Sequence, residues 1–263
     1  MTEIKNFMGW DSPGVALVTG ASSGIGAEFA RQLAVQGFST ILVARRKERL
    51  DDLASSLSSD FSGEHEVLVA DLSTNAGIEA VEQRIAIAGN LDVLVNNAGF
   101  GTIGKFQDVE MGSQLDMLSV HVLAPVRFMK AALPAMVDRK RGVIINVASL
   151  AAFAWGGGHA MYCATKAFLR AFSESLATDL QGTGVRVQAL CPGFVNTEFG
   201  ETGFHRSTIS EDIYMSTERV VAASLDAFQK KFISVVPGEA YQELAKGALK
   251  HQIHDLDKAS KKK

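Results

Sequence analysis

Short, mainly apolar runs alternate with segments of helical periodicity along most of the chain. The apolar runs are expected to be strands, and they occupy residues 15–18, 40–44, 66–70, 92–95, 143–147, 185–190 and 232–236. Strands that are apolar at successive positions are typical of a sheet that is buried on both of its faces.

The segments between these runs carry apolar residues at three- and four-residue intervals, which is the spacing of one helix face. They predict a helix after the first strand and further helices near residues 47–58, 78–88, 114–139, 160–180, 220–228 and 239–249. Pro125 and Pro134 fall inside the segment 114–139, so they should bend or locally open that helix.

The alternation of strands and helices predicts an α/β fold, doubly wound, with a seven-stranded parallel sheet and helices on both faces. Neither a repeat of solenoid length nor a long linker interrupts the pattern, so we expect residues 1–263 to form a single domain. Residues 196–217 are the least periodic stretch and are rich in Thr, Ser, Glu and Gly, which favours a functional loop over a domain boundary.

The composition excludes several classes of function. Of the 263 residues, 47% are hydrophobic and 21% are charged, and the formal net charge is −3, which is typical of a soluble globular protein. A nucleic-acid partner is not expected, because it would require a marked basic excess. Cys163 and Cys191 are too few for a disulfide framework or a four-cysteine zinc site, so we expect no metal site and a reducing cytoplasmic setting.

Residues 142–165 form an uncharged stretch of 24 residues, which is long enough to span a bilayer. Asn146, Ser149 and the glycines at 156–158 interrupt its apolar character, so we expect no membrane span here. The first residues of the chain contain acidic and amide groups and no apolar signal core, so we expect no secretion.

Residues 19–26, Thr-Gly-Ala-Ser-Ser-Gly-Ile-Gly, join the first predicted strand to the first predicted helix. A pyrophosphate binds main-chain N–H groups at a helix N-terminus, and the sharp turn before it requires backbone without a Cβ atom. The pattern predicts a dinucleotide site, with an ordinary tight turn as the alternative. The candidate residues are Gly20, Ser22, Ser23, Gly24, Ile25 and Gly26.

The spacing Gly-x-x-x-Gly-x-Gly resembles the glycine motif of the short-chain dehydrogenase/reductase family. Further matching motifs follow in order: Asn-Asn-Ala-Gly at residues 96–99, Ser149, a Tyr-x-x-x-Lys at Tyr162 and Lys166, and Pro192-Gly193 after the sixth strand. The resemblance covers about residues 14–240. It implies a Rossmann fold and hydride transfer between a nicotinamide cofactor and a carbonyl or secondary alcohol substrate.

Tyr162 and Lys166 are four residues apart, so they would share one face of the predicted helix 160–180. A free tyrosine has a pKa of about 10, and a nearby cation should lower it so that Tyr162 exchanges a proton with the substrate oxygen. The resemblance implies that Lys166 also hydrogen-bonds the nicotinamide ribose and that Ser149 hydrogen-bonds the substrate oxygen.

His121 stands where the family usually has an asparagine that organises a proton relay to the lysine. Imidazole both donates and accepts hydrogen bonds, so one hypothesis retains a relay with altered pH dependence. The other hypothesis is a histidine that is satisfied by a backbone carbonyl and does no chemistry. The sequence leaves both open.

The second predicted strand ends in Ala44-Arg45-Arg46. An NAD-preferring site has an acidic residue near this point, whereas an arginine pairs with the 2′-phosphate of NADP. We therefore predict NADP(H), with Arg45 favoured over Arg46 by resemblance; the alternative is that both arginines face solvent. The resemblance assigns further cofactor contacts to Asp71, Leu72, Asn97, Ala98, Gly99, Pro192, Gly193, Val195 and Thr197, with adenine beside the first two and the nicotinamide carboxamide beside the last four.

Mostly apolar residues are candidates for the walls of the substrate pocket: Phe100, Leu150, Phe153, Trp155, His159, Phe199, Phe204, Tyr214 and Met215. They favour a hydrophobic carbonyl or alcohol substrate and therefore an NADPH-dependent carbonyl reductase. The alternative is a nucleotide-sensing or scaffold protein that retains the fold without turnover. By resemblance we expect a homodimer or homotetramer built on helices 114–139 and 160–180.

Overall fold

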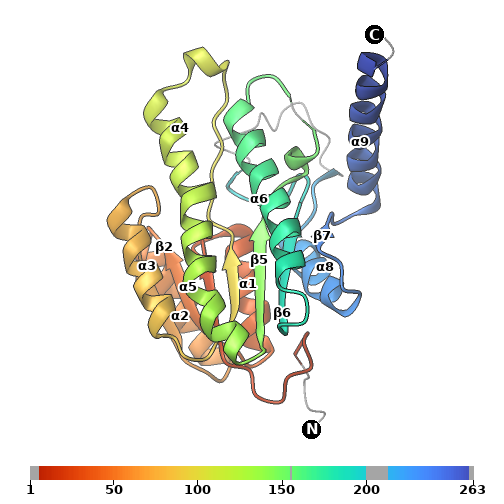
Figure 1. Cartoon of the computed structure of the whole chain (residues 1–263). Helices are drawn as coiled ribbons and strands as arrows, with labels where there is room; N and C mark the ends of the chain where they lie inside the picture. The colour runs from red at the N-terminus through yellow and green to blue at the C-terminus, as the bar shows by residue number, and fades with distance from the viewer. Residues whose placement is uncertain (1–5, 155, 200–212, 261–263) are drawn as a thin grey trace.

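The computed structural model describes residues 6–154, 156–199 and 213–260, and only the backbone of residues 255–260. Seven parallel strands form one sheet in the order β3-β2-β1-β4-β5-β6-β7 (Figure 1). The strands are β1 (Val15–Thr19), β2 (Ser39–Ala44), β3 (His65–Val69), β4 (Leu91–Asn96), β5 (Gly142–Val147), β6 (Val185–Leu190) and β7 (Ser234–Val235). The predicted doubly wound α/β fold is confirmed, and the strand order reverses direction between β1 and β4, where such folds bind ligands.

Helices cover both faces of the sheet. One face packs against α1 (Gly24–Val35), α2 (Lys47–Asp60) and α8 (Thr217–Gln229), and the other against α3 (Asn75–Ile87), α5 (Ala124–Asp138) and α6 (Ala160–Asp179). Because successive side chains of a strand point to opposite faces, Val18 joins the first of these cores and Leu17 the second. Both residues are fully buried, which explains why the strands are apolar at successive positions.

The last strand is shorter than the apolar run 232–236 predicts. Only Ser234 and Val235 pair with β6, at the edge of the sheet. Phe232 is 57% exposed, so this part of the apolar run lies outside the sheet and outside the core.

The predicted helix 114–139 is three consecutive segments. α4 (Met111–Leu118) is followed by a π-helical turn (Ser119–Leu123), and α5 then begins with Pro125 in its first turn. Pro125 has no N–H to donate into the preceding turn, so the helical ladder opens there, as expected from its position. The opening falls on His121, whose side chain is only 1% exposed.

The helical run Met111–Asp138 is also long and apolar enough to cross a membrane by length and composition alone. In its most apolar window 44% of the residues are buried inside the protein. Phe128, Met129 and Met136 of this run pack in the core beneath the sheet, so we interpret it as a core helix.

The C-terminal helix α9 (Glu239–Ser260) is longer than the predicted segment 239–249 and projects from the carboxyl end of the sheet (Figure 1). Its first turns pack on the body through Tyr241 and Ala245, which are buried, whereas Leu244 and Ile253 are each 60% exposed. Two short 3₁₀ helices, Phe106–Asp108 and Leu150–Ala152, lie in loops at the same end.

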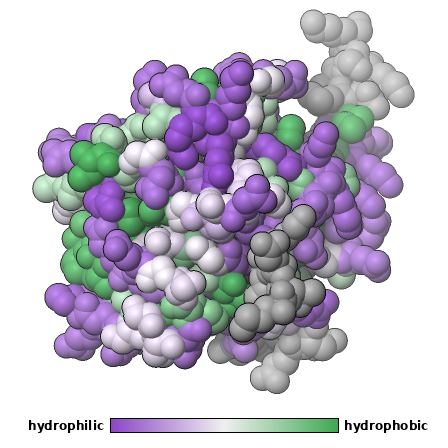
Figure 2. Space-filling model, turned by 90° about the horizontal axis from the view of Figure 1, so that it is seen from below, coloured by the Kyte–Doolittle hydropathy of each residue, from purple (hydrophilic) through white to green (hydrophobic). Residues whose placement is uncertain are grey.

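Hydrophilic side chains cover much of the opposite end of the molecule, and hydrophobic side chains gather toward the left edge of that view (Figure 2). The buried carboxylate of Asp92, at the start of β4, pairs there with Arg139 and Arg141. It also accepts a hydrogen bond from the Gly14 N–H at 2.8 Å, so it ties the amino ends of two strands to the end of α5.

Candidate active site

The glycine turn between β1 and α1 forms a shallow backbone cradle. Gly20 has a φ of +68°, which favours glycine, and a Cβ on Gly26 would lie 2.3 Å from the Gly20 carbonyl oxygen. Both positions therefore require glycine, and the first N–H groups of α1, which have no partner within the helix, lie beside this tight turn. This geometry fits a pyrophosphate.

The turn is braced from the neighbouring strand β4. The Thr19 hydroxyl accepts hydrogen bonds from the backbone N–H groups of Asn97 (2.9 Å) and Ala98 (3.0 Å). The Asn97 side chain donates to the Thr19 carbonyl oxygen at 2.9 Å. These bonds hold residues 96–99 against the glycine turn at the point where the strand order reverses.

Ser149, Tyr162 and Lys166 meet at the carboxyl end of β5. Tyr162 and Lys166 lie on the inner face of α6 and are 6% and 4% exposed. The Ser149 side chain forms a hydrogen bond with the Tyr162 side chain. The Lys166 ammonium lies 5.8 Å from the centre of the Tyr162 ring and donates to the Val147 carbonyl oxygen at 2.8 Å.

A buried polar chain fixes the register of this helix on the sheet. Asn96 of β4 donates to Asn146 of β5 at 2.8 Å, and Asn146 donates to the Ser173 hydroxyl of α6 at 2.8 Å. Ser173 lies on the same helix face as Tyr162 and Lys166, so these hydrogen bonds hold the catalytic candidates against the strand ends.

The pKa values of the pair are governed by burial. Burial raises the pKa of Tyr162 to about 12, although the hydrogen bond from Ser149 acts in the opposite direction. Burial also lowers the pKa of Lys166 to about 8. The prediction that the lysine lowers the tyrosine pKa is therefore wrong for this structure, because desolvation of the phenolate dominates. At neutral pH Tyr162 holds its proton and Lys166 remains charged.

His121 links the catalytic helix to the loop after β4. Its Nε2 accepts a hydrogen bond from the Phe100 N–H at 3.1 Å, and its Nδ1 lies 2.9 Å from the Thr165 hydroxyl. Thr165 donates its own proton to the Tyr162 carbonyl oxygen, so we assign the imidazole proton to Nδ1. Burial and the charge of Lys166 hold the pKa of His121 well below its usual value. The ring is neutral and both of its nitrogens are engaged, by partners other than a backbone carbonyl.

The two arginines after β2 differ in their surroundings. Arg46 donates to the hydroxyls of Ser22 (2.9 Å) and Ser23 (2.7 Å) in the glycine turn, and pairs with Glu198. Arg45 is exposed, and its charge helps to lower the pKa of Asp71, against the effect of burial and together with hydrogen bonds from Ser73. The geometry thus favours Arg46, not Arg45, as the residue beside the glycine turn.

The model of the short chain dehydrogenase family matches residues 14–207. The chain belongs to the short-chain dehydrogenase/reductase family. It is therefore an oxidoreductase of a family whose members transfer hydride with a nicotinamide cofactor.

Relatives of this short-chain dehydrogenase/reductase extend the match. An uncharacterized oxidoreductase of Myxococcus xanthus is 39% identical over 187 residues, 71% of this chain and 74% of that protein. The solved short-chain dehydrogenase from Sphingobium yanoikuyae in complex with NADPH is 34% identical, with a TM-score of 0.82 over 92% of this chain and 96% of that one. The bulky-bulky ketone specific alcohol dehydrogenase from Comamonas testosteroni is 31% identical, with a TM-score of 0.79 over 92% and 94% of the two chains.

The aromatic residues expected to line the substrate pocket of this dehydrogenase divide into two groups. The Phe199 ring lies 5.8 Å from the Tyr162 ring, and the Phe100 ring meets His121 edge-on at 5.9 Å, so both border the catalytic cluster. Phe153 is instead buried beneath the Arg170 guanidinium, 4.5 Å from its ring centre, in a small core shared with α9. Trp155 and Phe204 lie outside the described residues.

Residues 192–197 run from the end of β6 across the glycine turn. Thr197 is so close to Gly24 that a Cβ there would lie 3.0 Å from the threonine methyl group. Val195 forms an isolated bridge with Met215, and the Tyr241 hydroxyl of α9 donates to the Ile213 carbonyl oxygen at 2.7 Å. Both described ends of the expected substrate loop are therefore fixed, while residues 200–212 lie outside the described part of the chain.

Sequence reasoning missed several contacts of the site. The Leu72 side chain is 6% exposed and belongs to the same core cluster as the buried residues of α3, and its place beside adenine stays a prediction. Thr165, Tyr241 and Glu198 were not singled out, because each acts through a partner that is distant in the sequence. Only Thr165, one position before Lys166 and one helical turn from Tyr162, carried a local signal.

Proposed function

We propose that this protein is an NADPH-dependent reductase of hydrophobic carbonyl compounds, acting in one catalytic domain in the cytoplasm. The observation that carries the proposal is the cluster of half-buried Ser149 with buried Tyr162 and Lys166, beside a glycine turn whose backbone fits a pyrophosphate. A bound nicotinamide cofactor supplies the hydride, and therefore both electrons of the reduction.

The protein supplies the proton and the position of the substrate oxygen. Tyr162 is neutral because burial raises its pKa to about 12, so its O–H is available to the carbonyl oxygen as that oxygen gains charge. Ser149 can hydrogen-bond the same oxygen. The carbonyl carbon gains the hydride, the oxygen gains the tyrosine proton, and the product is an alcohol. Lys166, fixed by the Val147 carbonyl oxygen, is suited to hold the ribose hydroxyls.

Preference for NADP(H) over NAD(H) is supported by the end of β2. Ala44 stands where an acidic ribose ligand would be needed, and Arg46 is already oriented over Ser22 and Ser23. The similar Sphingobium dehydrogenase was solved in complex with NADPH, which agrees with this preference.

A bulky hydrophobic ketone is the proposed substrate class. Phe100 and Phe199 border the catalytic tyrosine, and Leu150 follows Ser149 directly. The similar enzyme from Comamonas testosteroni is described as specific for bulky-bulky ketones, which supports the assignment.

His121 is proposed as a positioning residue and not as a proton relay. Its acceptor holds the Phe100 N–H and its donor faces Thr165, so neither nitrogen is left for a proton path to Lys166. It joins the loop after β4 to the catalytic helix.

A homodimer or homotetramer is proposed through α4 and α6. Met111, Leu115 and Leu118 recur on one face of α4 and are 58%, 55% and 37% exposed, and Phe168 on α6 is 38% exposed. Burial of these side chains against a second copy would remove an apolar face from water.

The proposal is tested by following loss of the reduced-nicotinamide absorbance with a panel of ketones that increase in bulk on both sides of the carbonyl. We expect NADPH oxidation with the bulky members, and a Tyr162→Phe variant that still binds NADPH but turns over about 10²–10⁴ times more slowly. NADPH binding without oxidation of any ketone would instead indicate a nucleotide-binding protein without turnover.

A further inference from the structure

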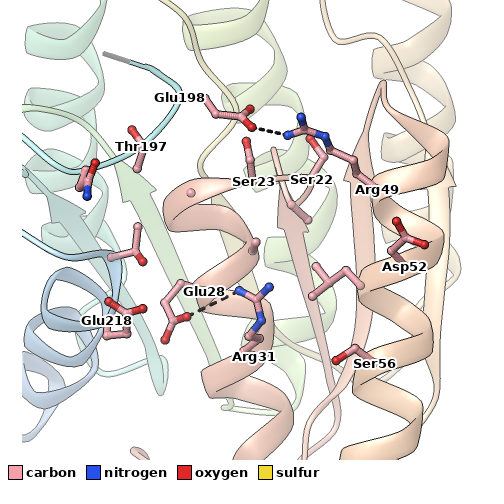
Figure 3. Close-up of a pocket in the computed structure, with 16 residues that line it drawn as sticks. Ser22, Ser23, Glu28, Arg31, Arg49, Asp52, Ser56, Thr197, Glu198 and Glu218 are labelled. Atoms are coloured by element: carbon pink, nitrogen blue, oxygen red, sulfur yellow. Dashed lines mark hydrogen bonds and ion pairs between the residues drawn. The ribbon is translucent and has the colours of Figure 1, made fainter. Parts of the chain in front are cut away.

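Glu198 places a carboxylate between Arg46 and Arg49 beside the glycine turn. Figure 3 shows its pairing with Arg49. One carboxylate oxygen lies 2.8 Å from the Arg46 guanidinium, and the other pairs with Arg49 of α2. These contacts hold the pKa of Glu198 at about 2, so the group is an anion at any physiological pH.

The carboxylate occupies a site that is built for an anion. Arg46 donates hydrogen bonds to the hydroxyls of Ser22 and Ser23, which belong to the turn that fits the cofactor pyrophosphate. The guanidinium groups of Arg46 and Arg49 therefore lie together beside this turn, and the Glu198 carboxylate, from the distant segment after β6, binds both of them.

The same region has room for the side chain to leave. A cavity of about 600 Å³ opens between α1, α2 and the segment containing Thr197 and Glu198, and it is lined by polar and charged side chains including Arg31 and Asp52 (Figure 3). Glu198 and both arginines are each 43–47% exposed, so release of the carboxylate leaves no buried charge without a partner.

We propose that Glu198 is an internal competitor for the 2′-phosphate of NADP(H), a carboxylate that occupies Arg46 and Arg49 until the phosphate displaces it. This inference rests on the proposed use of NADP(H). A phosphate monoester carries about −1.5 to −2 charges and three acceptor oxygens, so it replaces a single carboxylate at two arginines. NADH has no group that reaches this point, and Glu198 stays paired when NADH binds. Glu198 thereby sets how strongly the enzyme discriminates between the two cofactors.

The test is a fluorescence titration of the whole protein with NADPH and with NADH, without substrate. The variant is Glu198→Gln, which keeps the size of the side chain and removes its charge. Asp52→Asn is the matched control, because Asp52 lines the same cavity and the substitution changes the net charge equally. Arg46→Ala alone and combined with Glu198→Gln completes a double-mutant cycle.

We expect Glu198→Gln to tighten NADPH binding about two- to fivefold, the range of an exposed ion pair, with NADH affinity and the Asp52→Asn variant unchanged. The gain should shrink in the Arg46→Ala background. Unchanged or weaker NADPH binding, an equal gain for NADH, or an equal gain in Asp52→Asn each overturns the competitor role. A wild-type protein that binds NADH as tightly as NADPH contradicts the proposed cofactor preference separately, and a selective NADPH gain in Glu198→Gln would still support the competitor.

Discussion

The neutral state of buried His121 predicts a pH dependence of stability that can be isolated by substitution. The imidazole is 1% exposed, and burial together with the charge of Lys166 holds its pKa well below the usual value. In the unfolded chain the same histidine protonates near pH 6.5. Below that pH the unfolded state binds more protons than the folded state, so stability falls as the pH falls.

The size of this loss in stability follows from the one proton that His121 binds in the unfolded chain. While the folded histidine stays neutral, each unit below about pH 6.5 removes up to about 1.4 kcal/mol from the free energy of unfolding. Between about pH 7.5 and 5.5 the loss is about 1.4 kcal/mol, or about 3–6 °C in Tm for a chain of this size. His121→Gln lacks this loss, and its amide oxygen can still accept from the Phe100 N–H.

The assay is thermal and urea unfolding of the wild type and His121→Gln, followed by circular dichroism across this pH range. His65, whose pKa is also lowered by burial, is present in both proteins, so its contribution cancels in the difference. Parallel stability curves would mean that His121 protonates inside the folded protein, and the assigned tautomer and the positioning role of His121 would be wrong. His121→Asn is a second probe, because its shorter side chain leaves the Phe100 N–H unpaired and should cost about 1–3 kcal/mol.

Three further predictions concern the cofactor site, the catalytic lysine and the base of the sheet. Arg46→Ala should raise the KM for NADPH about 10- to 100-fold and leave the KM for NADH nearly unchanged, because charge-assisted hydrogen bonds to the phosphate are lost. Steady-state kinetics with both cofactors measures this, and an equal change in both KM values would contradict it. Since burial lowers the pKa of Lys166 to about 8, its charge is lost as the pH rises through that value, and kcat/KM should fall there. Lys166→Arg should shift this fall in kcat/KM to higher pH. A wild-type pH–rate profile that stays flat to about pH 10 would exclude the lowered pKa of Lys166. Asp92→Asn should lower the free energy of unfolding by about 1–3 kcal/mol, because Arg139 and Arg141 lose their buried counter-charge; urea unfolding measures this, and the KM values should match the wild type.

The sheet could be predicted from the sequence because its strands are buried on both faces and carry that burial as apolar runs. The exceptions are positions where the structural environment, and not the local sequence pattern, decides whether a residue joins a strand or a regular helix. At the sheet edge Phe232 is apolar, but it lies outside the strand and is exposed. The helix 114–139 opens at a π turn because Pro125 cannot donate, and the exact residues of such an opening depend on packing around His121.

The catalytic candidates were predicted as a group, but their electrostatics were not. Sequence spacing places Lys166 one turn from Tyr162 and suggests that the cation lowers the tyrosine pKa. It contains no measure of desolvation, which raises that pKa to about 12 in the folded protein. The partner of Arg46 was equally hidden, because Glu198 lies 152 residues further along the chain and is brought there only by the order of the strands.

The fixed ends of the segment after β6 have a consequence for how new specificity can arise in this enzyme. Phe194 and Met215 pair through the backbone, and Tyr241 fastens Ile213 to the C-terminal helix. Gly193 packs so tightly on the Tyr241 ring that an added Cβ would lie 2.3 Å away. These anchors fix Phe194 and Met215 through backbone groups, so their pairing does not depend on which side chains stand there. Directed evolution toward a different ketone should therefore spare Gly193 and Tyr241, because their contact leaves no room for a side chain at position 193.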